Sequence, residues 1–309
     1  MKNEILRRLS ALALGLALLL NAAPLPQAFA VEDDTDASSS DSADSTDTTD
    51  KTVVTTADSD PTVTAAAANA PALDATAALL VSPESDMVLY EKNADEKRYP
   101  ASTTKIMTAL LTLENVSDLS AVVTAEASDF ENVTADSSNA GIKLGEQVTV
   151  KDLLYALMLP SANEAAYMLA RHVSGSWEQF VDMMNERAAE LGCTGTHFCN
   201  PCGLHEDDHY TTAHDLYRIA KQAMKDATFR DIVSTVQHRM AKTNLHEERI
   251  ILTTNQLIFS SFQPWSYANC LGIKTGHTSQ AGNCFVGYAE YGDAKLFSVV
   301  LGCSSSSKE

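Results

Sequence analysis

Positive charge is scarce in this 309-residue sequence, which holds 22 Lys and Arg residues against 41 Asp and Glu residues. The net charge is −19 at pH 7, and residues 71–309 alone carry 30 acidic and 18 basic residues. Proteins that bind the phosphate backbone of nucleic acids need clustered Lys and Arg side chains. The composition therefore argues against a nucleic-acid partner.

The sequence also lacks an apolar run of the roughly 20 residues needed to span a bilayer. Its apolar run at residues 9–20 follows Lys2, Arg7 and Arg8 and precedes Ala28-Phe29-Ala30. A charged start, a short apolar core and small residues at the cleavage positions are typical of a secretory signal peptide. We expect residues 1–30 to be removed, with an uncleaved anchor as the alternative. The mature chain would have no transmembrane helix and would work outside the cytoplasm, at the cell wall or the outer face of the cytoplasmic membrane.

Aromatic residues are missing from residues 31–70, which consist mainly of Asp, Ser, Thr and Ala. Such a segment cannot bury enough apolar surface to offset the entropy lost when a chain becomes ordered. We predict a disordered acidic linker there, a folded domain over residues 71–303 and a tail over residues 304–309. Export permits disulfides, but the domain is long enough to build its own core without them. Its six cysteines therefore have two possible states, paired in disulfides or free and buried, and the sequence does not choose between them.

Residue periodicity predicts strands at both ends of the domain and helices between them. Strands are expected at residues 76–81, 87–91, 271–276, 284–291 and 295–302, and helices at residues 102–113, 150–159, 162–173, 176–191 and 212–226. Short strands and loops are expected over residues 115–148, whereas residues 234–249 show no clear period. This order predicts an α/β (α+β) fold, with an antiparallel sheet covered by helices and a mainly helical lobe.

Ser102 and Lys105 stand three residues apart at the start of an expected buried helix. Positions i and i+3 share a helix face, so a nucleophilic hydroxyl would lie beside an amine that can act as its base. Burial would lower the pKa of the lysine and favour its free-base form. The spacing alone is weak evidence, because about one such pair is expected by chance and residues 305–308 hold another.

Two further short motifs follow along the chain, Ser161-x-Asn163 and Lys274-Thr275-Gly276. Ser161 has an alternative interpretation, because Ser161 and Glu164 have the spacing of a capping box for the next helix. The Lys-Thr-Gly motif occurs once, against roughly a tenth of an occurrence expected by chance. The order of the three motifs carries more weight than any one of them.

With their flanking residues, the three motifs resemble the penicillin-binding D-alanyl-D-alanine carboxypeptidases, a group of low-molecular-mass exported serine peptidases. The likeness covers residues 72–303 and is densest at residues 99–108, 152–163, 200–204, 210–215 and 274–282. It implies a β-lactamase/DD-peptidase-like fold. It also implies an enzyme that removes the terminal D-Ala from peptidoglycan pentapeptide stems and so limits wall cross-linking.

The resemblance implies a role for the residues of the first two motifs. Ser102 would attack the carbonyl of the penultimate D-Ala and form an acyl-enzyme, with Lys105 as its base. Ser161 would relay a proton toward the leaving amine, and Asn163 would orient Lys105 and the substrate amide. β-Lactam antibiotics would then be covalent inhibitors, and the resemblance implies neither a cofactor nor a metal.

The third motif would bind the substrate. Lys274 and Thr275 would face the terminal carboxylate, and Gly276 would leave room for the substrate backbone along its strand. The backbone N–H groups of Ser102 and His277 would form the oxyanion hole. Family members usually continue into a helix with an arginine for the carboxylate. The sequence given does not include that helix, so two alternatives stay open: the chain is shortened relative to the family, or carboxylate binding rests on Lys274 and Thr275 alone.

Other functions stay open from the sequence alone. A D,D-endopeptidase that cuts cross-linked peptidoglycan would use the same residues, whereas a β-lactamase would need a carboxylate segment that does not follow Asn163. A protein that binds peptidoglycan without catalysis is an alternative of another class. A zinc-dependent peptidase is a third, because Cys199, Cys202, His205 and His209 resemble metal ligands, although their spacing is far shorter than that of a zinc finger.

Overall fold

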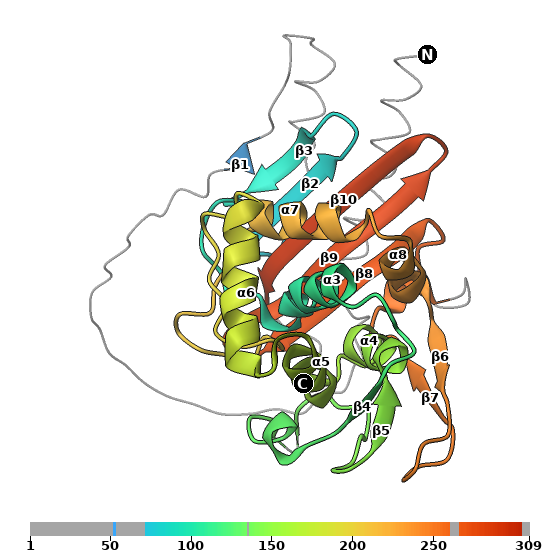
Figure 1. The fold of residues 1–309 in the computed structure, drawn as a ribbon. Helices are drawn as coiled ribbons and strands as arrows, with labels where there is room; N and C mark the ends of the chain where they lie inside the picture. Colours follow the sequence, from blue (N-terminus) through green and yellow to red (C-terminus); the bar gives the residue numbers. More distant parts are fainter. Residues whose placement is uncertain (1–51, 54–71, 135, 260–265, 305–309) are drawn as a thin grey trace, which may run out of the picture.

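A computed structural model describes residues 52–53, 72–134, 136–259 and 266–304, whose arrangement is shown in Figure 1. The predicted signal peptide lies outside the described residues. So does most of the predicted linker, within which Thr52–Val53 form the short strand β1. In the part of the chain that the structure describes, no helix is both long and apolar enough to cross a membrane.

The two ends of the domain meet in one antiparallel sheet, as the sequence predicted. Its six strands lie in the order β1-β3-β2-β10-β9-β8. The N-terminal strands are β1, β2 (Ala77–Ser82) and β3 (Met87–Lys92), and the C-terminal strands are β8 (Cys270–Thr278), β9 (Gly282–Tyr291) and β10 (Ala294–Cys303). Val299 of β10 pairs with Leu79 of β2, so the first hairpin extends the sheet formed by the last three strands.

Helices cover one face of this sheet and surround a central helix, α3 (Figure 1). Helix α3 (Lys105–Asn115) is buried from Lys105 to Thr112. Its neighbours are α4 (Val150–Met158), α5 (Asn163–Ser174), α6 (Trp177–Glu190), α7 (Ala213–Ala223) and α8 (Ala227–Ser234). A helix that is apolar around most of its surface is stable in water only when neighbours cover it, so the sequence of α3 accounts for its central position.

Two small sheets flank the helices. Strands β4 (Val122–Thr124) and β5 (Gln147–Thr149) pair in the region where short strands were expected. Strands β6 (Gln237–Met240) and β7 (Arg249–Leu252) form a hairpin that periodicity did not predict. Of its eight residues only Met240 and Ile251 are buried, which is too few to give a strand pattern. Helix α8 was also not predicted, and α7 ends at Ala223, three residues before the expected end of that helix.

The six cysteines are free thiols. Four of them are buried, namely Cys193, Cys202, Cys270 and Cys284. Burial raises the pKa of the Cys284 thiol to about 11, so this thiol stays protonated at neutral pH. The buried cysteines therefore pack as small apolar side chains, which is one of the two possibilities that the sequence left open.

Candidate active site

Ser102 and Lys105 lie at the junction of two helical turns. Ser102 belongs to the 3-10 helix η1 (Ala101–Thr104), and Lys105 is the first residue of α3. The sequence predicted both residues on one α-helix. In the structure the 3-10 helix η1 continues directly into the α-helix α3, so only Lys105 belongs to the α-helix. The side chains still share a face, with Lys105 Nζ 3.1 Å from Ser102 Oγ.

The Lys105 amine is fully buried and has two further partners. It lies 2.8 Å from Asn163 Oδ1 and 2.6 Å from the backbone carbonyl of Cys202. Both of these oxygens only accept hydrogen bonds, so they take two N–H groups of a neutral amine and leave its lone pair for the Ser102 hydroxyl. Burial lowers the pKa of Lys105 to about 8, which makes this neutral form accessible near physiological pH.

The Cys202 carbonyl is carried by the loop of residues 197–210, which packs against the start of α3. Gly203 makes the packing possible: its φ is +85°, and a Cβ atom there would lie 1.9 Å from the carbonyl oxygen of Ala101. Thr108 Oγ1 donates to the carbonyl of Pro201 at 2.6 Å and fixes the same segment. Sequence patterns could not single out the Cys202 carbonyl, since every residue has a backbone carbonyl.

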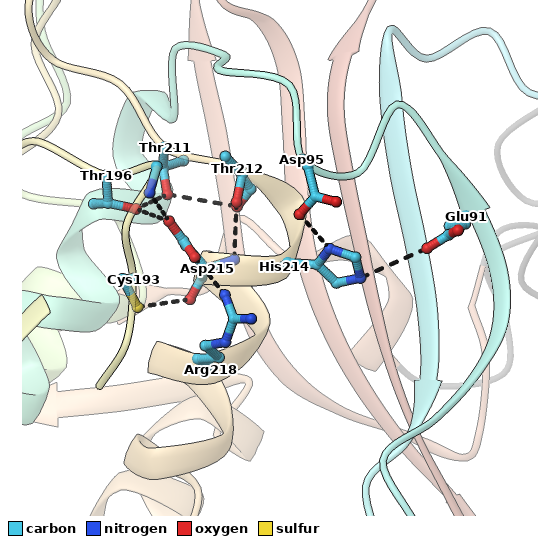
Figure 2. Close-up of polar contacts among 10 residues, drawn as sticks. Glu91, Asp95, Cys193, Thr196, Thr211, Thr212, His214, Asp215 and Arg218 are labelled. Carbon is cyan, nitrogen blue, oxygen red and sulfur yellow. Dashed lines mark hydrogen bonds and ion pairs between the residues drawn. The ribbon is translucent and has the colours of Figure 1, made fainter. Parts of the chain in front are cut away.

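Asp215 joins the two ends of this loop, as Figure 2 shows. Its carboxylate accepts hydrogen bonds from the hydroxyl of Thr196 at 2.8 Å and from Arg218 at 2.6 Å. Its backbone N–H donates to Thr212 Oγ1 at 3.1 Å. Thr196 precedes the loop and Thr212 follows it, so a single buried residue holds both ends of the segment that places the Cys202 carbonyl.

The four side chains that resemble zinc ligands have other partners. His209 Nδ1 accepts from the N–H of Cys199 at 3.2 Å, so Nε2 carries the proton and donates to Thr104 Oγ1 at 2.9 Å. Burial lowers the pKa of His209 to about 3, which keeps the ring neutral. Among residues 72–134, 136–259 and 266–304, no three His, Cys, Asp or Glu side chains gather as a metal site requires.

Ser161 lies in the turn between α4 and α5 in a rare backbone conformation. Its φ is +66°, in the left-handed region, which costs a non-glycine residue about 1–3 kcal/mol. Its Oγ is buried, and no hydrogen-bond partner for it is found among the described residues. Strain and an unsatisfied hydroxyl at one residue are typical of functional sites.

The capping box predicted as an alternative for Ser161 is wrong. Ala162 occupies the N-cap position of α5 without a side-chain cap, because the left-handed backbone of Ser161 places that residue outside the helix start. Glu164 accepts from the backbone N–H of Ala140 at 2.7 Å. Burial raises the pKa of its carboxyl group. The Ser161 hydroxyl is therefore not used to begin the helix.

Strand β8 brings the third motif to the same place. A Cβ atom on Gly276 would lie 3.0 Å from the backbone nitrogen of Ser102, so the strand passes directly beside η1. Lys274 is buried and donates to the carbonyl of Thr275 at 2.9 Å. Burial lowers the pKa of Lys274 well below its usual value, and the nearby Lys105 lowers it further. His277 Nδ1 lies 3.0 Å from Oδ1 of Asn283, which is on the neighbouring strand β9.

The structure thus brings the candidate nucleophile Ser102, the two lysines and strand β8 to the start of α3. Ser102, Lys105 and Asn163 are in direct hydrogen-bond contact, and Gly276 borders them. Thr275 has a contact that sequence analysis missed, with its Oγ1 2.6 Å from Thr254 Oγ1. Thr254 lies outside the three motifs, so no pattern pointed to it.

Comparison with known proteins identifies the family. Residues 64–305 match the D-alanyl-D-alanine carboxypeptidase family of peptidases. The crystal structure of the Streptomyces K15 DD-transpeptidase is similar, with a TM-score of 0.70 and 35% identity over 76% of this chain and 92% of that chain. The chain belongs to the D-alanyl-D-alanine carboxypeptidase family, and the fold predicted from the sequence is confirmed.

Two curated relatives have similar identities over most of this chain. D-alanyl-D-alanine carboxypeptidase DacF of Bacillus subtilis (strain 168) is 34% identical over 233 residues, which is 75% of this chain and 58% of that protein. The carboxypeptidase of Streptomyces sp. (strain K15) is 37% identical over 230 residues, which is 70% of this chain and 77% of that protein. The chain therefore spans little more than half the length of the Bacillus relative.

Proposed function

We propose that this protein is a serine-type D,D-carboxypeptidase that removes the terminal D-Ala from peptidoglycan pentapeptide stems outside the cytoplasmic membrane. One observation carries the proposal: the buried amine of Lys105 lies 3.1 Å from Ser102 Oγ, with its other two hydrogen bonds directed at acceptors. This is the geometry of a base that holds its lone pair toward a serine nucleophile. Family membership supports the substrate.

Acylation begins when Lys105 takes the proton of Ser102 as Oγ bonds to the carbonyl carbon of the penultimate D-Ala. The carbonyl electrons move onto oxygen, where the N–H groups of Ser102 and His277 would stabilise the negative charge. The close approach of Gly276 to the Ser102 nitrogen supports this arrangement, because it sets the β8 backbone beside that N–H group.

The bond to the terminal D-Ala then breaks, and the leaving nitrogen takes the proton that Lys105 holds, relayed by the Ser161 hydroxyl. The unpartnered Oγ of Ser161 supports this role, since its hydrogen-bonding capacity is not used within the described protein. A substrate carboxylate near Lys274 would favour the protonated form of that lysine, and the resulting cation would keep Lys105 neutral for catalysis.

Water completes the reaction by attacking the ester on Ser102. Lys105 accepts a proton from the water, and Ser102 Oγ takes it back as the ester bond breaks. The stem peptide leaves with a new carboxylate. A penicillin would follow the first step alone, because its opened ring stays attached to the acyl group and blocks the water. β-Lactams would therefore be covalent inhibitors.

The rate of acylation is expected to rise with pH. The pKa of Lys105 is lowered to about 8 by burial, and only the unprotonated amine can accept the serine proton. Labelling by a fluorescent penicillin, timed from about pH 6 to 10, should therefore increase with a midpoint near 8. A rate that is flat or falls over this range would contradict the role of Lys105 as base.

Ser161→Gly is expected to stabilise the fold and to lower the rate of catalysis. Glycine adopts the φ of +66° without strain, and the buried hydroxyl is removed, so the free energy of unfolding should rise by about 1 kcal/mol. Without the proton relay, release of D-Ala should fall about a hundredfold. Thermal unfolding and a D-Ala assay on the same preparation measure both effects, and a variant that keeps full activity argues against the relay.

The proposed function is tested by product analysis on the purified mature chain. A stem peptide ending in D-Ala-D-Ala should release free D-Ala, and a cross-linked muropeptide dimer should be cut much more slowly. Faster cleavage of the dimer would favour the D,D-endopeptidase. The Streptomyces K15 protein of similar structure is named a DD-transpeptidase, and a transpeptidase would form a new peptide bond when an acceptor amine is added. Binding without any product would favour the non-catalytic alternative.

A further inference from the structure

Thr254 connects the two sides of the candidate site. Its backbone N–H donates to the carbonyl of Leu159 at 3.0 Å, two residues before Ser161. Its Oγ1 lies 2.6 Å from Thr275 Oγ1 on β8. One residue therefore contacts both the turn that carries the second motif and the strand that carries the third.

The neighbours of Thr254 hold its backbone in place. The N–H of Thr253 donates to the carbonyl of Val236 at 2.9 Å, and Thr253 Oγ1 accepts from the N–H of Asn255 at 3.1 Å. Asn255 is buried and caps the 3-10 helix η3 (Gln256–Ile258) by accepting from the N–H of Leu257 at 3.1 Å. The β-branched side chain of Thr254 thus projects from a fixed backbone with few rotamers available.

The two threonine hydroxyls can act as a pair of donors. Each hydroxyl has one O–H group and two acceptor positions, so their mutual hydrogen bond uses one of the two protons and leaves the other free. Thr254 is exposed, which leaves its hydroxyl open to a ligand. Lys274 precedes Thr275 on β8, and its amine donates to the backbone carbonyl of Thr275 at 2.9 Å. Two donors beside a lysine suit a carboxylate.

We infer that Thr254 binds the terminal carboxylate of the substrate together with Thr275. The two hydroxyls exchange their mutual hydrogen bond for the ligand, so that each donates its proton to one carboxylate oxygen. This inference rests on the proposed function, since the carboxylate belongs to a peptide ending in D-Ala. It adds a donor to a subsite for which the sequence offered only Lys274 and Thr275. Specificity for a free carboxyl end then depends on a residue outside the three motifs.

The test compares two substrates that differ only in charge at the end, a stem peptide ending in D-Ala-D-Ala and its C-terminal amide. The wild type should prefer the free acid in kcat/KM. Thr254→Val should lower kcat/KM for the acid about tenfold or more, because a charge-assisted hydrogen bond is lost, and should change the value for the amide little. Thr254→Ser keeps the hydroxyl and should retain the preference. Thr124→Val, an exposed threonine on β4, is the matched control.

The outcomes separate this inference from the proposed function. A wild type that releases no D-Ala from the free acid contradicts both. An active wild type with a Thr254→Val variant that keeps the full preference for the acid contradicts the role of Thr254 alone. Equal losses on acid and amide would mean that Thr254 only supports the fold, which also contradicts the inference. Acylation by benzylpenicillin and by its methyl ester should show the same contrast.

Discussion

Lys105→Gln is expected to lower the rate of Ser102 acylation by about 10²- to 10⁴-fold, the usual contribution of a general base. Glutamine is similar in size and can still donate to Asn163 Oδ1 and to the Cys202 carbonyl, but its amide nitrogen has no basic lone pair. The fold should therefore persist while proton transfer is lost. Stopped-flow labelling with a fluorescent penicillin measures the rate, and thermal unfolding checks the fold.

Lys151→Gln provides the matched control, because Lys151 is an exposed lysine on α4. This variant should label as fast as the wild type. A Lys105→Gln variant that is folded and labels within a few-fold of the wild-type rate would mean that another group takes the Ser102 proton. Lys105 would then not be the general base, although Ser102 could still be the nucleophile.

Gly203→Ala is expected to destabilise the protein by about 2–5 kcal/mol, combining a left-handed backbone with an overpacked contact. The added Cβ would lie 1.9 Å from the carbonyl oxygen of Ala101, so the 197–210 loop must move away from η1. The Cys202 carbonyl would move with it and leave the Lys105 amine. We expect a lower melting temperature and slower penicillin labelling in the same variant.

Gly141→Ala separates the two causes. Gly141 also has a positive φ, of +72°, but a Cβ there would meet no atom within 4 Å. Its substitution should cost only the backbone strain, about 1–2 kcal/mol, and leave labelling unchanged. If Gly203→Ala were no more destabilising than Gly141→Ala, the close contact with Ala101 would not matter, and the loop would not be what fixes the Cys202 carbonyl.

Much of the fold could be predicted because its signals are local. The apolar surface of residues 106–113 predicted a buried helix, and the strands at both ends of the domain predicted a shared sheet. Hairpin β6–β7 could not be predicted, since its pairing depends on contacts with the rest of the domain and only Met240 and Ile251 reach the core. Tertiary contacts decide such segments more than propensity does.

The sequence could predict which side chains gather at the candidate site, but not the backbone groups and backbone conformations there. Ser102, Lys105 and Gly276 meet as their motifs indicated, although their roles stay predictions. The Cys202 carbonyl could not be found in the sequence, because a backbone oxygen carries no residue signature. The capping box at Ser161 could not be excluded from the sequence, since the spacing to Glu164 fits one and the left-handed φ that excludes it appears only in the structure.

The central claim is that Ser102 is the residue that becomes acylated, and peptide mapping by mass spectrometry tests it most directly. The wild type, incubated with benzylpenicillin and digested, should carry one penicilloyl adduct, located on the peptide that contains Ser102. Ser102→Ala should carry none while it melts at the wild-type temperature. An adduct at another residue, or one that survives Ser102→Ala, would contradict the account.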